Sequence, residues 1–252
     1  MSSLQKEIIV MGGSDPSGGA GIQADLLTLS KLGISAKSVI SAVTAQNEKK
    51  FWSYESVSAK NFSDQLRAVE ASAKHPILKI GMMGHFQLLV LLKAWIQKTR
   101  PSFVILDPVF ASSTGAKLLD SLGIQFLKTM LPWIDLITPN ISEAEKLSGL
   151  RIHNFTGMKE AGEKILKNGA QQILLKGGHL KGNPCDLLIT PEMNYHFPGR
   201  RLRPKNTHGT GCTLASAIAG FLSLGKDCVE SIHLARKMVR QKITSHSLSL
   251  RG

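Results

Sequence analysis

Apolar runs of strand length alternate with longer segments of helical period along almost the whole chain, and this alternation limits the possible folds most. Strands that are apolar throughout are typical of a parallel sheet with helices on both faces. The expected strands are 7–14, 36–46, 77–84, 103–109, 134–140 and 171–178, and the expected helices are 19–33, 61–75, 86–99, 115–131 and 156–169. The expected C-terminal part is a hairpin of 185–190 and 193–197 followed by helices at 210–224 and 227–246.

This pattern predicts an α/β protein with three layers, α/β/α, around a mostly parallel central sheet. A chain of 252 residues could hold one large domain or two small ones. No linker, repeat or low-complexity segment interrupts the alternation, so we expect a single domain over residues 1–252.

Composition excludes several classes of protein. The most apolar stretch, 88–96, is too short to span a membrane, and the N-terminus lacks the pattern of a signal peptide. We therefore expect a cytoplasmic location and no membrane partner. The cysteines Cys185, Cys212 and Cys228 are odd in number and have no C-x-x-C spacing, which argues against a disulfide framework or a zinc site.

The chain is strongly basic, with a net charge of +13 and its densest basic group at 199–205. Such a charge can be ordinary solvated surface, a field that attracts phosphates, or a nucleic-acid footprint. No helix-turn-helix, zinc or aromatic–basic motif supports a specific nucleic-acid partner. The choice between solvated surface and phosphate attraction stays open.

The segment GTGCT, residues 209–213, opens directly into an apolar helix. The first amides of a helix lack partners and carry partial positive charge, so glycines there can expose an anion site. Gly209, Thr210, Gly211 and Cys212 are therefore candidates for holding a phosphate; a plain helix entry capped by Thr210 or Asn206 is the alternative. A thiol in this position is expected to have a lowered pKa.

A second glycine-rich junction, GSDPSGGAGIQAD at 13–25, follows the first strand. Gly13 would let the backbone approach a substrate, and Asp25 could face that site or simply favour the first helical turn. The G-x-G-x-x-A pattern at 19–24 does not indicate a dinucleotide site, because the glycines lie beyond the strand and no acid ends the next one.

Polar side chains follow other apolar strands. Asn140 and Glu143 have the spacing of a capping box, and with Asp107 they could also hold a hydrated magnesium ion at the strand ends. Lys176 ends a very apolar strand, where it calls for a negative partner such as a phosphate. Together with GTGCT these groups indicate phosphoryl transfer, although the chain has no G-x-x-x-x-G-K-[ST] motif.

Seven blocks in order carry a resemblance to a known family: GSDPSGGAGIQAD, VTAQN, KIGMM, LDPV, TPNISEAE, KGGH and NTHGTGCT. From about residue 7 to 240 the chain resembles the hydroxymethylpyrimidine/phosphomethylpyrimidine kinases of thiamine biosynthesis, in the ribokinase-like superfamily. The resemblance implies ATP-dependent phosphorylation of 4-amino-5-hydroxymethyl-2-methylpyrimidine and then of its monophosphate.

The resemblance also assigns roles. It implies a pyrimidine pocket of Gly13, Asp25, Gln46 and Met82, and a nucleotide–magnesium region of Asp107, Asn140 and Glu143 in which Asp107 and Glu143 hold Mg²⁺ through water. It further implies a phosphate contact by Lys176 and an anion hole from Gly209 to Cys212, with Cys212 in the catalytic position. A homodimer is expected. A pyridoxal kinase and a basic nucleic-acid-binding protein on a degenerate kinase fold are the alternatives.

Overall fold

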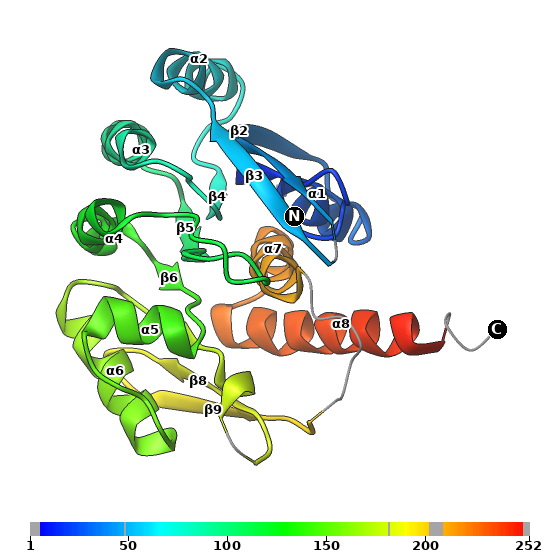
Figure 1. Ribbon diagram of the computed structural model, residues 1–252, viewed down its shortest axis with the longest axis vertical. Coiled ribbons are helices and arrows are strands. Elements are labelled where there is room, and N and C mark those ends of the chain that lie inside the picture. The colour runs from blue at the N-terminus through cyan, green and yellow to red at the C-terminus, as the bar shows by residue number, and fades with distance from the viewer. Residues whose placement is uncertain (1–5, 48, 181, 202–208, 249–252) are drawn as a thin grey trace.

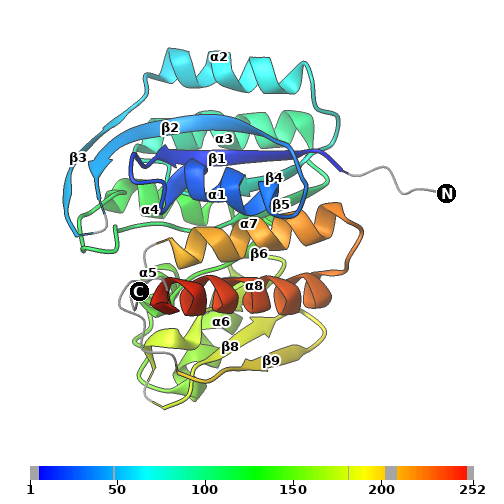
Figure 2. The ribbon, with the colours of Figure 1, turned by 90° about the vertical axis from the view of Figure 1, so that its right-hand side faces the viewer.

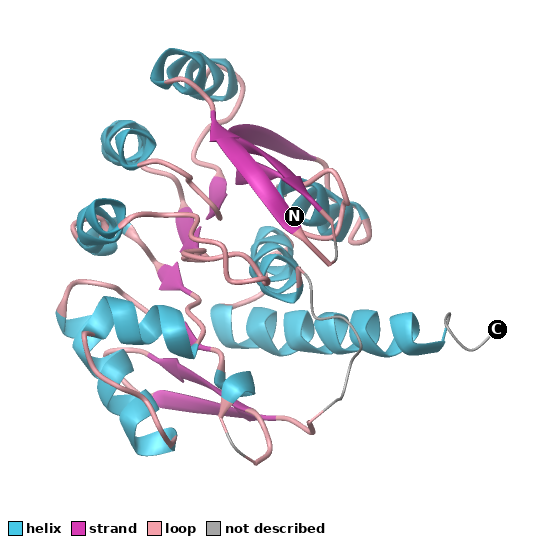
Figure 3. Cartoon of the chain, viewed as in Figure 1, coloured by secondary structure: helices cyan, strands magenta, loops and turns pink. Residues whose placement is uncertain are grey.

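The computed structural model describes residues 6–47, 49–180, 182–201 and 209–248. The strands are β1 Ile8–Ser14, β2 Ala36–Gln46, β3 Phe51–Ser56, β4 Ile77–Ile80, β5 Phe103–Leu106, β6 Leu136–Ile137, β7 Ile173–Leu175, β8 Cys185–Ile189 and β9 Asn194–Pro198. The helices are α1 Gly21–Ser30, α2 Ala59–Glu70, α3 Phe86–Thr99, α4 Ser121–Lys128, α5 Ile141–Ser148, α6 Phe155–Lys167, α7 Thr210–Ser223 and α8 Cys228–Leu248, with 3₁₀ turns at Leu131–Trp133 and Gly177–His179. Figures 1 and 3 show their arrangement.

The described strands form one sheet in the order β3-β2-β1-β4-β5-β6-β7-β8-β9. The pairs from β2 through β7 are parallel, whereas β3, β8 and β9 pair antiparallel at the two edges. The predicted mostly parallel sheet and the hairpin of β8 and β9 are therefore confirmed.

Side chains of the central strands alternate between two cores. Ile9 and Met11 of β1 pack in the core beneath α2–α6, whereas Ile8 and Val10 pack in the core beneath α1, α7 and α8. Because successive side chains of a strand point to opposite faces, one apolar strand can serve both helical layers. Figures 1 and 2 show these layers, with α7 and α8 side by side. The three-layer prediction is confirmed.

Two local predictions were wrong. The helix expected over 115–131 begins only at Ser121, because Asp120 caps the Gly123 amide at 2.7 Å and the preceding residues form a bridge between Ala111 and Lys117. The edge strand β3 was not predicted, because it has no continuous apolar run and its side chains are half-buried or exposed. Both cases depend on neighbouring structure that local periodicity does not encode.

The parallel strands place their carboxyl ends at one edge of the sheet, and α7 begins at that same edge. A ligand site in such a sheet lies beyond the carboxyl ends of the strands. Among the described residues, no helix is both long and apolar enough to cross a membrane.

Candidate active site

A cavity of about 870 Å³ opens beyond the carboxyl ends of the parallel strands. It is lined by every site residue predicted from the sequence: Gly13, Asp25, Gln46, Met82, Asp107, Asn140, Glu143, Lys176, Gly209, Thr210, Gly211 and Cys212. These residues come from segments spread over almost 200 positions of the chain and meet only because the sheet brings the strand ends together.

The start of α7 forms one wall of the cavity. Gly209 is the N-cap in the left-handed conformation (φ 72°), and among the described residues this N-cap, which is a glycine, makes no side-chain hydrogen bond. The predicted alternative of a Thr210 cap is therefore wrong, and Asn206 lies outside the described residues. A helix N-terminus without a side-chain cap leaves its first amides available to an anion.

Gly209 and Gly211, the two glycines of this turn, have different structural roles. A Cβ on Gly209 would lie 1.7 Å from the Gly19 carbonyl oxygen, so this glycine lets the turn pack against the loop before α1. A Cβ on Gly211 would lie 3.4 Å from Lys176 Nζ and 3.5 Å from Asp107 Oδ2. Of the two, Gly211 is the one that faces the charged groups of the site.

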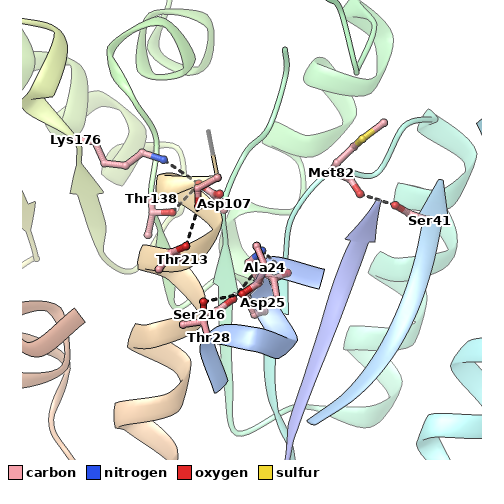
Figure 4. A network of polar contacts seen from close by, with 12 residues as sticks. Ala24, Asp25, Thr28, Ser41, Met82, Asp107, Thr138, Lys176, Thr213 and Ser216 are labelled. Carbon is pink, nitrogen blue, oxygen red and sulfur yellow. Dashed lines mark hydrogen bonds and ion pairs between the residues drawn. The ribbon is translucent and has the colours of Figure 1, made fainter. Parts of the chain in front are cut away.

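Asp107 and Lys176 form an ion pair beside the first turn of α7 (Figure 4). Lys176 Nζ lies 2.9 Å from Asp107 Oδ1, which also accepts a 3.1 Å hydrogen bond from Thr138 Oγ1. Burial alone would raise the pKa of Asp107, but Lys176 and then Lys79 outweigh it and lower that pKa. The Asp107 carboxylate is therefore a negative partner of Lys176, and the phosphate contact of Lys176 stays a prediction.

Asn140 and Glu143 form the predicted capping box of α5 and line the cavity as well. The Asn140 side chain accepts from the Glu143 amide at 2.9 Å, and Glu143 Oε2 accepts from the Asn140 amide at 2.7 Å. Glu143 Oε2 lies 4.0 Å from Lys176 Nζ. Burial raises the pKa of Glu143 to about 7, since Lys176 opposes the rise only in part and Asp107 adds to it.

These acids suit a magnesium ion that is shared with a nucleotide. Among the described residues, no three or more His, Cys, Asp or Glu side chains gather into a metal cluster. Mg²⁺ at nucleotide sites usually takes one or two carboxylates, several waters and phosphate oxygens. Asp107 and Glu143 provide that number of carboxylates beside the start of α7.

A second ion pair, which the sequence analysis missed, joins two buried residues that line the cavity. Lys79 Nζ contacts both carboxylate oxygens of Asp25 at 2.8 and 2.7 Å. Ser216 Oγ donates to Asp25 at 2.7 Å (Figure 4). Burial would lower the pKa of Lys79, but Asp25, then Cys212 and Asp107, raise it above its usual value. The signal in the sequence was a lysine within the otherwise apolar strand ILKI, which requires a buried counter-ion.

The Cys212 thiol differs from its prediction. Burial raises its pKa to about 11; Lys79 opposes this rise, while the carboxylates of Asp25 and Asp107 add to it. The expected lowering of this pKa is therefore wrong, because burial and two neighbouring carboxylates outweigh Lys79 and the backbone hydrogen bond from Gly21. The thiol is protonated at neutral pH.

The opposite end of the cavity is largely apolar. Met82 packs with Ala42 and Leu118 in a small cluster that also contacts Tyr54 and Val109. A Cβ on Gly13 would lie 2.9 Å from Met82 Sδ, so a larger residue there would require the Met82 side chain to shift. Gln46 ends β2 at this part of the cavity and offers an amide donor and acceptor. This end suits a small flat ligand with a polar edge.

Comparison with known proteins agrees with this site. A sequence model of the family described as phosphomethylpyrimidine kinase matches residues 15–251. The hydroxymethylpyrimidine/phosphomethylpyrimidine kinase of Aquifex aeolicus is 34% identical, with 92% of each chain covered. The bifunctional thiamine biosynthesis protein ThiED of Geobacter sulfurreducens is 40% identical over 94% of this chain, which spans 49% of that longer protein.

Solved structures show the same architecture. A crystal structure of phosphomethylpyrimidine kinase from Clostridium difficile matches with a TM-score of 0.84 and 36% identity, covering 94% of this chain and 99% of that one. A pyridoxal kinase from Staphylococcus aureus in complex with ADP matches with a TM-score of 0.86 and 27% identity, covering 94% and 88%. The predicted ribokinase-like fold is confirmed, and the chain belongs to the phosphomethylpyrimidine kinase family.

Proposed function

We propose that this protein is an ATP-dependent kinase that phosphorylates 4-amino-5-hydroxymethyl-2-methylpyrimidine and then its monophosphate, giving the pyrophosphate used in thiamine biosynthesis. One observation carries the proposal. The start of α7, which has a glycine as its N-cap, faces the Asp107–Lys176 ion pair in the same cavity that Gln46 and Met82 line. An anion cradle, a charged pair and an apolar pocket are the parts that phosphoryl transfer to a small alcohol needs.

In this proposal the Asp107–Lys176 pair opens when MgATP binds. Asp107 and Glu143 would hold Mg²⁺ through water, and the ion supplies charge neutralisation to the phosphate oxygens. Lys176 is then released from Asp107 and can bind the transferred phosphoryl group together with the amides of Gly211 and Cys212. Before MgATP binds, Asp107 and Glu143 outweigh burial and raise the pKa of Lys176, so the lysine carries its proton into the complex.

The substrate hydroxyl does not need a strong base in this mechanism. Phosphoryl transfer through a loose transition state depends on positioning and charge stabilisation more than on proton removal. Cys212 has a thiol whose pKa is about 11, so at neutral pH it orients the hydroxyl as a neutral group. We assign the larger share of the catalysis to Lys176 and the amides of the α7 start.

A pyridoxal kinase remains the second candidate, because a pyridoxal kinase of S. aureus matches almost the whole chain. Gln46 supports the pyrimidine, since its amide can pair with the donor and acceptor edge of an aminopyrimidine. The deciding experiment compares turnover on the pyrimidine alcohol, its monophosphate and pyridoxal with MgATP. Phosphorylation of both pyrimidine forms is expected; turnover on pyridoxal alone would overturn the proposal.

Other expectations from the sequence stay predictions. These are a homodimer, a cytoplasmic location, a single domain over residues 1–252, and no specific nucleic-acid partner. Light scattering of the purified protein would test the dimer. Nucleic-acid titration at physiological salt would test the last prediction, since non-specific electrostatic binding falls steeply with salt. The basic group at 199–205 lies largely outside the described residues.

A further inference from the structure

A second cavity, of about 470 Å³, lies beside the segment that joins β5 to α4. Residues 109–118 of that segment form a small hairpin, in which Ala111 and Lys117 make a bridge and the Leu118 amide donates to the Phe110 carbonyl at 3.0 Å (Figure 1). Val109 and Leu118 line the active-site cavity, whereas Phe110 and Lys117 line the second cavity. The mechanism proposed above uses no residue of this second cavity.

The polar part of the second cavity is positively charged. Lys117 of the hairpin, Lys128 at the end of α4 and Lys146 of α5 line it, and no Asp or Glu is among its described lining residues. Within the described part of the chain, none of the three lysines has a carboxylate at ion-pair distance. Asp120 follows the hairpin but accepts from the Gly123 amide at 2.7 Å as the cap of α4. The three ammonium groups are therefore available to an anion.

The remaining lining is largely apolar. Phe110 and Leu119 are buried side chains that line the cavity, and Ile124 lines it from α4. Ile124 and Lys128 are four residues apart, which places them on the same face of that helix. Lys146 Nζ lies 5.8 Å from the centre of the Phe110 ring. Positive charge and an apolar surface thus meet in one cavity.

A small molecule with an anionic group and an apolar body fits this lining. The volume lies within the range of small-molecule sites, roughly 300–1,000 Å³. Three lysines favour a phosphate over a carboxylate, because a phosphate monoester has a charge of about −1.5 to −2 at neutral pH. Lysines bind phosphate oxygens through charge-assisted hydrogen bonds, and an apolar body is stabilised where it covers buried apolar side chains.

We propose that the second cavity binds a small organic phosphate ester, with its phosphate held by the three lysines and its apolar body packed on Phe110, Leu119 and Ile124. This site is separate from the transfer site, and it does not depend on which alcohol the kinase phosphorylates. Ala111 lines both cavities, so an occupant of the second cavity contacts the hairpin that also borders the active site.

The first test follows the Ile124 methyl resonance in protein labelled at its isoleucine methyl groups while phenyl phosphate is added. This resonance reports on the second cavity even when phosphate also occupies the active site. We expect a saturable shift, with an affinity about tenfold or more above that of inorganic phosphate, which lacks the apolar body. No saturable shift, or equal affinities for the two ligands, would refute the proposal.

The same titration is applied to two double variants. Lys117→Ala/Lys128→Ala should weaken phenyl phosphate binding by about tenfold or more, since it removes two charged partners of the phosphate. The matched control Lys60→Ala/Lys159→Ala removes the same charge from α2 and α6, where both lysines pair with acids, and it should bind as wild type does. Equal weakening in both would indicate long-range attraction only and would overturn the site. Thermal melting establishes that each variant is folded.

The second test locates the ligand and requires no turnover. In crystals soaked with 4-bromophenyl phosphate, the anomalous signal of bromine should place the ring beside Phe110 and Leu119. A signal only at the start of α7 would refute the second site even in an active kinase. A signal in the second cavity would support it even if no pyrimidine were phosphorylated.

Discussion

Two ion pairs of the same composition, Asp25–Lys79 and Asp107–Lys176, lie near each other and differ mainly in their exposure. The Asp25 and Lys79 side chains are 0% and 1% exposed, and both carboxylate oxygens contact the ammonium group. The Asp107 and Lys176 side chains are 3% and 19% exposed, and one oxygen makes the contact. We call these the sealed pair and the open pair.

The difference in exposure indicates a structural role for the sealed pair and a role in the reaction for the open pair. The sealed pair links α1 to β4, and Ser216 of α7 also donates to Asp25, so it joins three elements that border the cavity. Both pairs line the cavity, but the open pair is the more exposed, faces Gly211 and has Glu143 nearby as a further acid. We infer that the open pair exchanges partners when a ligand binds, whereas the sealed pair keeps the scaffold fixed.

The largest expected effect tests the sealed pair. Lys79→Met leaves Asp25 buried without its counter-ion, and breaking a buried pair in this way typically costs about 3–5 kcal/mol. Urea denaturation should show this loss in the free energy of unfolding. The matched control is Lys79→Met/Asp25→Asn, which removes both charges and should regain a large part of the loss. A single variant as stable as wild type would contradict the structural role.

The next effect tests the open pair. Lys176→Met should lower kcat/KM by about 10²–10³, the usual loss when one preorganised group that stabilises transition-state charge is removed. Its loss of unfolding free energy should be smaller than that of Lys79→Met, because Lys176 reaches the cavity. Steady-state kinetics and denaturation of the two variants give the comparison directly. If Lys176→Met proved the less stable and the more active of the two, the assignment of roles would be reversed.

A smaller effect concerns Glu143 and pH. Its pKa of about 7 means that the ionised form, which binds Mg²⁺, is populated only as the pH rises above that value. The affinity for Mg–nucleotide should therefore rise about tenfold from pH 6 to pH 8, since one pKa unit is a factor of ten. Fluorescence titration with a nucleotide analogue would measure it.

Glu143→Gln is the control for that pH dependence and should flatten it. The same raised pKa predicts that the unfolding free energy falls as the pH rises between about 4.5 and 7, because the folded protein binds the extra proton in that window. This fall should also be weaker in Glu143→Gln. An identical pH profile in both proteins would show that another group titrates.

The smallest effect is expected at Cys212. Cys212→Ser should keep kcat within about tenfold of wild type, because phosphoryl transfer needs little help from a base. Gly211→Ala should cost more, since its methyl group would fill space beside Lys176 Nζ and Asp107 Oδ2, where the transferred phosphoryl group is proposed to bind. Turnover assays of the two variants measure this difference in kcat. A severe loss of kcat in Cys212→Ser together with a nearly normal kcat in Gly211→Ala would assign the catalysis to the thiol.

Sequence reasoning singled out both residues of the open pair but only Asp25 of the sealed pair, and it predicted neither pairing. Asp107 and Lys176 each end an apolar strand, and a charged residue in that place points to the ligand edge of a parallel sheet. Lys79 occupies an interior strand position, where its meaning depended on a partner 54 residues away in α1. Likewise, the prediction for Cys212 used the helix N-terminus alone and lacked the carboxylates that surround the thiol.

The sequence by itself determined the layers, because the period of the apolar residues decides which face of each strand or helix is buried. It also determined which residues follow the strands, and so which could reach the site. Only the tertiary structure decided which charges meet, which pair is sealed, and that the thiol keeps its proton. The reason is physical: periodicity is local, whereas burial and Coulomb interactions depend on every neighbour that folding brings near.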